Sequence, residues 1–233
     1  MSKKAVFFDL GGTLLVMRRD RIFRRVLAEE GRDVPLDRIH VAYQKEEKQW
    51  LSNYGTRVMT PEQTSEAYRV LDQSVFSFLF SGEPETEAIR VSRAVRRRWP
   101  ELEDDIPLSL YPDVEPELGR LKGEGFSMGL ISNAPADTGK TVEALGLSRF
   151  LDPIVISGKV GYTKPHPEIF RIALREAGVS SNVAIHVGDL YEADVVGARN
   201  AGIEGILLDR DGSQVGLDCP RISILSEIHA HLG

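Results

Sequence analysis

The sequence predicts an α/β protein with a parallel sheet and a long helical segment inserted near its start. From Tyr111 onward, short apolar runs alternate with helical periodicity, which is typical of β-α-β units and therefore of parallel strands. Residues 16–108, by contrast, have helical periodicity with few strand signals. We therefore assign residues 1–15 and 109–233 to an α/β core and residues 16–108 to a helical insertion.

The first strand is the best-defined element of the core. Four consecutive apolar residues, Ala5 to Phe8, suit a strand that is covered on both faces, and the strand ends at Asp9. Gly11 and Gly12 follow and let the backbone turn sharply and approach a ligand. A carboxylate at this end of a parallel strand lies where open α/β sheets place their chemistry, although a turn aspartate is the alternative.

The helical insertion contains one sharp start signal. Thr60 suits the N-cap position, and Pro61 suits the first helical position. Gln63 can return a hydrogen bond to the N-cap, as in a capping box, so a helix is expected to start here and run towards Phe80. A further helix is expected over Glu85 to Trp99. The proline-bounded segment from Pro100 to Pro107 is interpreted as a linker. Arginine clusters in the insertion favour solvated helix faces over an anion site.

The rest of the core is predicted to alternate helices with strands. The expected helices cover 114–124, 137–145, 167–177, 192–201 and 223–231, and the expected strands cover 126–131, 153–156, 182–187 and 205–208.

Composition narrows the classes of function. The chain has 233 residues, is 42% hydrophobic and 27% charged, and carries a net charge of −6, which is ordinary for a globular protein and argues against a nucleic-acid binder. The single Cys219 excludes an internal disulfide and a cysteine-built zinc site. The first apolar run is too short for a signal peptide or a membrane span, so we expect a cytoplasmic protein without membrane partners.

Polar side chains follow three further predicted core segments. Ser132 and Asn133 come just after a strand and suit hydrogen bonding to a phosphoryl oxygen, although a helix cap is the commoner role. Lys164 precedes two prolines and would neutralise an anionic centre. Asp189 ends a strand, and Asp194 lies one helical turn further on. Carboxylate oxygens of this kind suit Mg²⁺, so Asp9 and Asp189 imply a metal if they converge.

In this order, Asp9-Leu-Gly-Gly-Thr13, Ser132-Asn133, Lys164-Pro-x-Pro and Gly188-Asp189-x-x-x-x-Asp194 resemble the four motifs of the haloacid dehalogenase superfamily of hydrolases. The resemblance covers the whole chain. It implies a three-layer, Rossmann-like core with a parallel sheet of about five strands, and a helical cap inserted after the first strand.

The resemblance also implies roles for individual residues. Asp9 would be the nucleophile that forms a covalent aspartyl intermediate, with Ser132 and Lys164 as its catalytic partners. Substrate would also contact Gly12 and Asn133. The predicted Mg²⁺ ligands are Asp9, the Gly11 carbonyl, Asp189 and, directly or through water, Asp194.

One position departs from the phosphatase pattern. Phosphatases of this superfamily carry a second aspartate two residues after the nucleophile, which serves as general acid and base, and here that position is Gly11. Such a group typically contributes about 10²- to 10⁴-fold, so slow turnover of poor leaving groups is expected. His40, His166 and Tyr162 are the candidates that could replace the missing acid. For His166 a structural role is preferred over a catalytic one.

Several functions therefore stay open. The favoured one is a magnesium-dependent phosphatase, monomeric or homodimeric, acting on a small phosphorylated molecule with weak or specialised activity. A catalytically impaired binding or regulatory protein is the second. A dehalogenase is disfavoured by Asp189, and a phosphonate-cleaving enzyme would need a Schiff-base lysine in the cap, for which Lys45 and Lys48 are the candidates.

Overall fold

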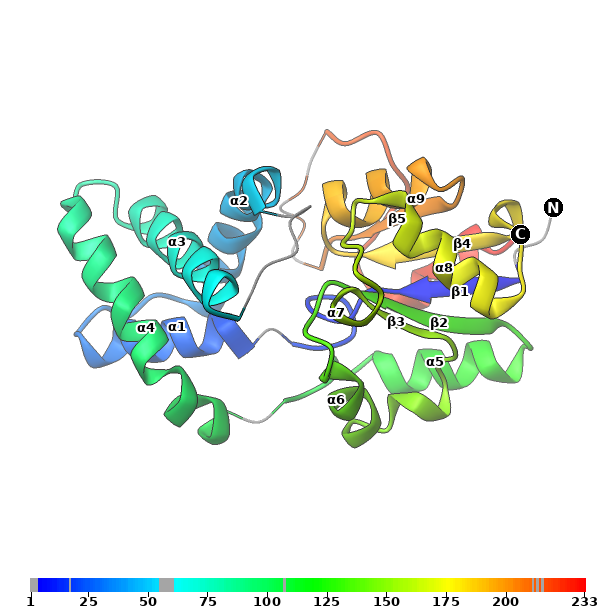
Figure 1. The fold of residues 1–233 in the computed structure, drawn as a ribbon, viewed down its shortest axis with the longest axis horizontal. Coiled ribbons are helices and arrows are strands. Elements are labelled where there is room, and N and C mark those ends of the chain that lie inside the picture. Colours follow the sequence, from blue (N-terminus) through cyan, green and yellow to red (C-terminus); the bar gives the residue numbers. More distant parts are fainter. Residues whose placement is uncertain are drawn as a thin grey trace. The chain divides into compact units, whose positions relative to one another are not determined.

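The computed structural model describes residues 4–16, 18–54, 61–106, 108–210, 212, 214 and 216–233. The chain forms two compact units (Figure 1). The core unit comprises Met1–Val16 with Ser109–Gly233, and the helical unit comprises Met17–Leu108.

The core unit is built on a parallel sheet of six strands in the order β3-β2-β1-β4-β5-β6. The predicted α/β class with about five parallel strands is confirmed, and the sixth strand is an addition. That strand has two residues and pairs with the end of β5, so it leaves no apolar run in the sequence to recognise. The strands are β1 (Ala5–Phe8), β2 (Ser127–Ser132), β3 (Ile154–Ile156), β4 (Ala184–Gly188), β5 (Glu204–Leu208) and β6 (Arg221–Ile222).

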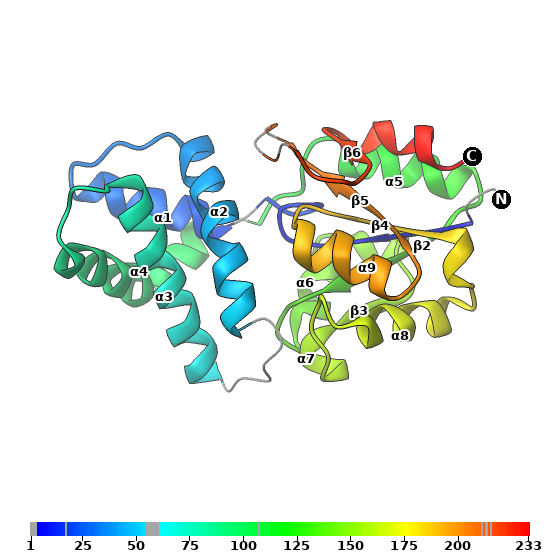
Figure 2. The same ribbon diagram turned by 90° about the horizontal axis from the view of Figure 1, so that it is seen from above.

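Helices cover both faces of this sheet and make a three-layer structure (Figure 2). Apolar side chains of α5, α6 and the C-terminal segment η4 pack on one face, and those of α8 and α9 pack on the other. The helical segments are α5 (Val114–Gly123), α6 (Thr138–Ala144), η1 (Leu147–Arg149), α7 (Ser157–Val160), α8 (Pro167–Ala177), η2 (Ser181–Val183), η3 (Tyr191–Val196), α9 (Gly197–Asn200) and η4 (Leu225–His231).

Two predicted helices of the core differ in kind from the expectation. The segment expected as one helix over 192–201 begins as the π-helical η3 and continues as α9. At its start, the N–H of the N-cap residue Leu190 donates to Asp194 Oδ2 at 3.0 Å. The last predicted helix is the 3₁₀-helical η4. Single π turns are frequent at functional sites, and this one contains Asp194.

The helical unit consists of α1 (Arg18–Glu29), α2 (Leu36–Tyr54), α3 (Pro61–Leu79) and α4 (Glu85–Asp105). Apolar stripes of the four helices form a core of their own. Pro61 is the first residue of α3, as predicted, while Thr60 lies outside the described residues. In the described part of the chain, no helix combines the length and apolar character that a membrane span requires.

The prediction of a linker from Pro100 to Pro107 is wrong over most of this segment. Helix α4 continues through Pro100 to Asp105. A proline inside a helix costs about 3 kcal/mol, because it removes one backbone hydrogen bond and crowds the preceding turn. Leu102, two residues beyond the start of this segment, is buried in the core of the helical unit. Its burial favours continuation of the helix.

The arginines of the insertion lie largely in ion pairs on the helix surfaces. Arg90 donates through both Nη atoms to Glu30, at 2.7 and 2.8 Å, and Arg98 Nη1 lies 2.5 Å from Glu29 Oε2. These pairs join α4 to the last residue of α1 and to the residue that follows it. They fit the interpretation of the arginine clusters as solvated faces.

A buried aspartate connects three helices of this unit. Asp72 in α3 is fully buried, its Oδ1 accepts from the Tyr43 hydroxyl of α2 at 2.5 Å, and its Oδ2 lies 2.7 Å from Arg96 Nη2 of α4. Burial raises the pKa of Asp72, while Arg96 and Tyr43 oppose the rise. The carboxylate therefore depends on these two partners.

Replacing Tyr43 with phenylalanine should lower the free energy of unfolding by about 1.5 to 3 kcal/mol, because Asp72 would lose a hydrogen bond in a place that water does not reach. The matched control is Tyr162→Phe at an exposed tyrosine, which should stay within about 0.5 kcal/mol of the native protein. Urea denaturation measures both. Equal effects of the two substitutions would contradict a special role for the Tyr43 hydroxyl.

Candidate active site

The polar residues predicted at the strand ends lie along one edge of the sheet. Strands β2, β1 and β4 are neighbours and parallel, so their carboxyl ends meet at the same edge. Asp9 follows β1, Ser132 is the last residue of β2, and Asp189 follows β4. All three side chains are buried.

Lys164 bonds one carboxylate that follows strand β1 and another that follows strand β4. Its Nζ donates to Asp9 Oδ1 and to Asp194 Oδ1, both at 2.6 Å. The lysine is 2% exposed, so no water layer screens these two ion pairs. The short loop before α8 thereby delivers an ammonium group to the nucleophile that the sequence predicts.

Asn133 holds the backbone of this lysine. Its Nδ2 donates to the Lys164 carbonyl at 2.9 Å, and its Oδ1 accepts from the Lys164 N–H at 2.7 Å. A side-chain amide that bonds both the N–H and the C=O of one residue fixes the backbone of that residue. Substrate contact at Asn133 stays a prediction, and in the structure both polar atoms of its side chain bond the Lys164 backbone.

The three carboxylates of the predicted metal site converge. One oxygen from each of Asp9, Asp189 and Asp194 lies within 4.8 Å of the other two. Asp194 is engaged on both oxygens, since Oδ1 accepts from Lys164 and Oδ2 from the Leu190 N–H.

Two glycines make room for these carboxylates. A Cβ at Gly12, where φ is +80°, would lie 2.2 Å from Asp189 Oδ2, and a Cβ at Gly188 would lie 2.1 Å from Asp194 Cγ. Real Cβ contacts are never this short. Each carboxylate therefore occupies the space of a missing side chain.

The site concentrates negative charge in a place of low dielectric. Burial raises the pKa of Asp9 to about 6, although Lys164 acts against this rise. Burial would also raise the pKa of Asp194, but Lys164 and His186 hold it well below its usual range. Burial tends to lower the pKa of Lys164, and the two carboxylates raise it above its ordinary value. The lysine is therefore a permanent cation.

The donor set fits a hard divalent cation. Three carboxylates face one ammonium, which leaves an excess of two negative charges in the cluster when the acids are ionised. Buried charge of this kind is costly unless it is paired or bound to a metal. Oxygen donors without sulfur suit Mg²⁺, for which one or two protein carboxylates suffice. Asp9 and Asp189 are the residues that would hold it, with Asp194 engaged by Lys164.

Replacing Gly188 with alanine should displace the Asp194 carboxylate, because the new Cβ and Asp194 Cγ cannot occupy the same space. We expect a loss of stability of about 1 to 3 kcal/mol and a weakened affinity for Mg²⁺. Gly119→Ala in α5 is the control, since its Cβ meets nothing within 4 Å. It should leave the affinity for Mg²⁺ unchanged and raise stability by about 0.5 to 1 kcal/mol, because alanine favours a helix more than glycine does. Urea denaturation and titration calorimetry are the measurements. Unaltered Mg²⁺ affinity in Gly188→Ala would contradict the prediction.

The loop after β1 turns tightly around Gly11 and Gly12. Gly11 bridges to Leu15, and the Gly12 N–H donates to the Leu15 carbonyl at 2.8 Å. Thr13 Oγ1 donates to Asp189 Oδ1 at 3.4 Å, which links this loop to the one after β4. The Gly11 carbonyl remains a predicted metal ligand.

Sequence analysis did not identify three supporting residues. His186 in β4 contacts Asp194, with Nε2 3.0 Å from Oδ1. Arg210 Nη2 donates to the Thr13 carbonyl at 2.9 Å, and Gln214 Nε2 donates to the Asp189 carbonyl at 2.8 Å. Arg210 and its partner are 197 residues apart and Gln214 and its partner 25, whereas His186 and Asp194 are only 8 apart. His186 had one available signal, since it is a polar residue inside an apolar strand.

The other residues considered for catalysis have partners of their own. His40 Nδ1 lies 2.7 Å from Asp20 Oδ2 in the helical unit. His166 Nδ1 accepts from the Glu168 N–H at the start of α8, so its predicted structural role is confirmed. The Tyr162 ring lies beside that of His166, with centroids 4.9 Å apart. Lys45 Nζ lies 5.0 Å from the centroid of the Phe78 ring, and the Lys48 side chain lies outside the described residues.

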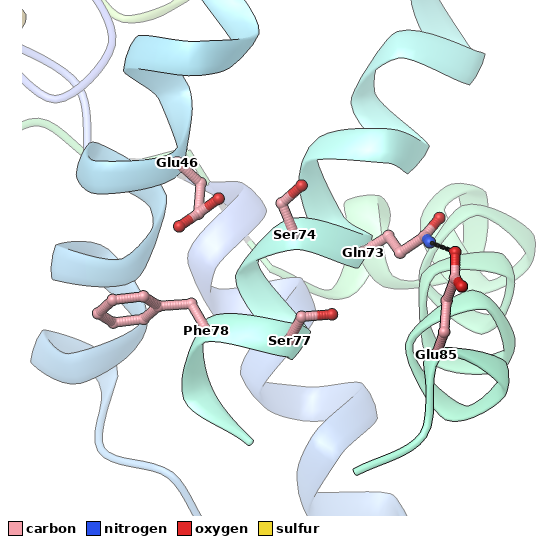
Figure 3. A pocket seen from close by; sticks show the side chains of 6 residues that line it. All are labelled: Glu46, Gln73, Ser74, Ser77, Phe78 and Glu85. Atoms are coloured by element: carbon pink, nitrogen blue, oxygen red, sulfur yellow. Dashed lines mark hydrogen bonds between the residues drawn. The ribbon is translucent and has the colours of Figure 1, made fainter. Parts of the chain in front are cut away.

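A separate pocket lies in the helical unit between α2, α3 and the start of α4 (Figure 3). Two carboxylates, Glu46 and Glu85, line it, and Gln73 Nε2 donates to Glu85 Oε1 at 3.4 Å. Acidic walls repel phosphate. We therefore do not assign this pocket to a phosphorylated substrate. It is lined by Glu46, Gln73, Ser74, Ser77, Phe78 and Glu85.

Comparison with known families gives one match that covers most of the chain. The model of a hydrolase family described as haloacid dehalogenase-like hydrolase matches residues 3–202. The matched range includes all four sequence motifs.

Comparison with characterised proteins finds phosphatases. A phosphoserine phosphatase of Thermus thermophilus is 36% identical over 116 residues, which are 49% of this chain and 43% of that protein. A glyceraldehyde 3-phosphate phosphatase of Methanopyrus kandleri is 36% identical over 104 residues, which are 44% of this chain and 45% of that protein. The chain thus spans about half the length of the curated relatives that it matches.

Solved structures match over the whole chain. The protein YfnB of Bacillus subtilis, solved with bound magnesium, has a TM-score of 0.69 at 19% identity and is covered over 100% of both chains. At that identity the likeness establishes the fold alone. A 2-haloacid dehalogenase of Pseudomonas syringae has a TM-score of 0.58 at 25% identity, covering 99% of this chain and 100% of that one.

Proposed function

Because this chain belongs to the haloacid dehalogenase-like hydrolase family, we propose that it is a magnesium-dependent phosphatase that acts on a small phosphorylated molecule. The observation that carries the proposal is the buried Asp9, which Lys164 holds beside two further carboxylates. The phosphatases among its relatives support this reaction class. The proposal includes a cap role for the helical unit, a cytoplasmic location and a monomer or homodimer.

Asp9 is the proposed nucleophile. Its carboxylate attacks the phosphorus atom, the bond to the leaving oxygen breaks, and an aspartyl phosphate forms, which water then hydrolyses to inorganic phosphate and free Asp9. Lys164 keeps one oxygen of Asp9 in place and offsets negative charge as the phosphate approaches. The Ser132 hydroxyl donates to a phosphoryl oxygen, and Asn133 maintains the position of Lys164.

Magnesium, when bound, would neutralise phosphoryl charge and orient the phosphate towards Asp9. Its proposed ligands are Asp9, the Gly11 carbonyl and Asp189. Asp194, whose oxygens are engaged by Lys164 and the Leu190 N–H, supports the site from behind. The magnesium in the structure of YfnB motivates the choice of this ion.

The absence of a carboxylate at Gly11 governs which substrates turn over well. No side chain at this position protonates the leaving oxygen, so alkyl phosphates, whose alkoxides leave poorly, are expected to react slowly. Acyl and aryl phosphates leave without much assistance and should react faster. The proposed activity is therefore specialised for activated phosphates.

Removing magnesium should stop hydrolysis of acetyl phosphate and of an aryl phosphate. We expect turnover to fall to background in excess chelator and to recover when Mg²⁺ is restored. Phosphate release measures the effect, and a titration with Ca²⁺ in place of Mg²⁺ tests the requirement for a small octahedral ion. Full activity in chelator would contradict the proposal and favour a metal-free reaction like that of a dehalogenase.

The dehalogenase alternative rests on the similarity to the Pseudomonas syringae enzyme. The converging carboxylates speak against it, because an acidic cluster suits a cation and not a halide. A binding or regulatory protein is the other alternative, and Gly11 is the observation in its favour. Binding of Mg²⁺ without turnover of any phosphate would support that alternative.

A further inference from the structure

His186 occupies a position behind the proposed nucleophile that the reaction scheme does not use. On the basis of the proposed function, we propose that His186 is a positioning residue, which orients the Asp194 carboxylate so that Lys164 is held against Asp9. The chain of contacts runs through side chains alone. His186 Nε2 lies 3.0 Å from Asp194 Oδ1. The same oxygen accepts from Lys164 Nζ at 2.6 Å, and Lys164 Nζ also donates to Asp9 Oδ1 at 2.6 Å.

The ring of His186 lies in an apolar environment. It is fully buried in β4, directly beside Phe7 of β1 in the sheet register, and it meets the Phe170 ring edge to face at a centroid distance of 5.1 Å. Packing alone would be satisfied there by an apolar side chain. Phe7 of the sheet and Phe170 of α8 belong to the same apolar cluster, so the polar ring of His186 is an exception in its surroundings.

The hydrogen bonding identifies that reason. An ionised carboxylate accepts and does not donate, so the shared proton lies on His186 Nε2. The other ring nitrogen, Nδ1, is buried and has no hydrogen-bond partner among the described residues. One nitrogen of the ring is thus left unsatisfied while the other bonds Asp194. The bond to Asp194 is therefore the polar interaction that explains a histidine at this position.

This bond bears on Lys164 because both donors share one oxygen. Asp194 Oδ1 accepts from His186 and from Lys164, while Oδ2 accepts from the Leu190 N–H. Three donors in different directions define one orientation of the carboxylate. With the His186 donor removed, Oδ1 is held from one side only, and Lys164 can follow Asp194 away from Asp9.

The test compares two substitutions of similar length. His186→Gln places an amide nitrogen at the same number of bonds from the backbone as Nε2 and keeps the donor, whereas His186→Met fills similar space without one. Both lose the aromatic contact with Phe170. We expect kcat for acetyl phosphate to fall by about 10- to 100-fold in His186→Met, with KM changed by less than about threefold, and to recover largely in His186→Gln.

Equal kcat values for the two variants, whether high or low, would overturn the inference, because they would show that a hydrogen-bond donor at position 186 does not affect turnover. Circular dichroism and urea denaturation establish that both variants fold. A purely structural role predicts that kcat follows the loss of stability instead of the presence of a donor.

A second readout does not depend on turnover. The Lys164 ammonium group, buried and doubly bonded, should give a slowly exchanging ¹H–¹⁵N signal in the native protein and in His186→Gln, and this signal should shift or broaden in His186→Met. An unchanged signal in His186→Met would overturn the inference even if the native protein hydrolyses no phosphate. Loss of native turnover in Asp9→Asn tests the proposed function separately.

Discussion

Replacing Asp9 with asparagine should reduce phosphate release by at least about 10³-fold, because the reaction would lose its nucleophile. The substitution keeps the size of the side chain and leaves an oxygen to face Lys164, so the change is one of charge and nucleophilicity. The covalent aspartyl phosphate should disappear as well. Acid quenching with labelled acetyl phosphate measures the phosphoenzyme, and phosphate release measures turnover.

The control for Asp9→Asn is Asp33→Asn, which removes the same charge from an exposed aspartate of the helical unit whose side chain is 88% accessible. It should leave turnover unchanged. Persistent activity and phosphoenzyme in a clean preparation of Asp9→Asn would remove Asp9 from its proposed role. Retention of activity with loss of the phosphoenzyme would instead indicate direct attack by water.

Placing an aspartate at Gly11 should raise turnover of an alkyl phosphate such as glycerol phosphate by about 10²- to 10⁴-fold, because the leaving alkoxide would gain a proton donor. Acetyl phosphate, whose leaving group needs little assistance, should gain far less. Gly12 takes the positive φ of this loop, and Gly11 is not among the described glycines that do so. The backbone at position 11 therefore accepts a side chain more readily than position 12.

The control for this substitution is Gly11→Asn, which has nearly the same shape but does not transfer a proton. The ratio of kcat/KM for the alkyl and acyl substrates, measured in both variants, separates proton transfer from improved packing. Equal gains in the two variants, or no gain in Gly11→Asp, would contradict the interpretation of Gly11 as a missing acid.

Much of the core could be predicted because its signals are local. The strand before Asp9 is a run of buried apolar residues. Helix α8 begins at Pro167 and ends before Gly178, as its sequence predicts, and Gly178 takes the left-handed backbone conformation. The error at Pro100 has a different origin. There a local stop signal is outweighed by burial of Leu102, which depends on helices distant in the sequence.

For the site, residue order and short-range pattern were enough to identify the family, the α/β class and the strand ends at which Asp9, Ser132 and Asp189 lie. Catalytic and metal-binding roles for these residues stay predictions. The side-chain partners within the site became visible in the folded chain. Asn133 bonds the Lys164 backbone and His186 bonds Asp194, because side-chain hydrogen bonds depend on which segments the fold brings together.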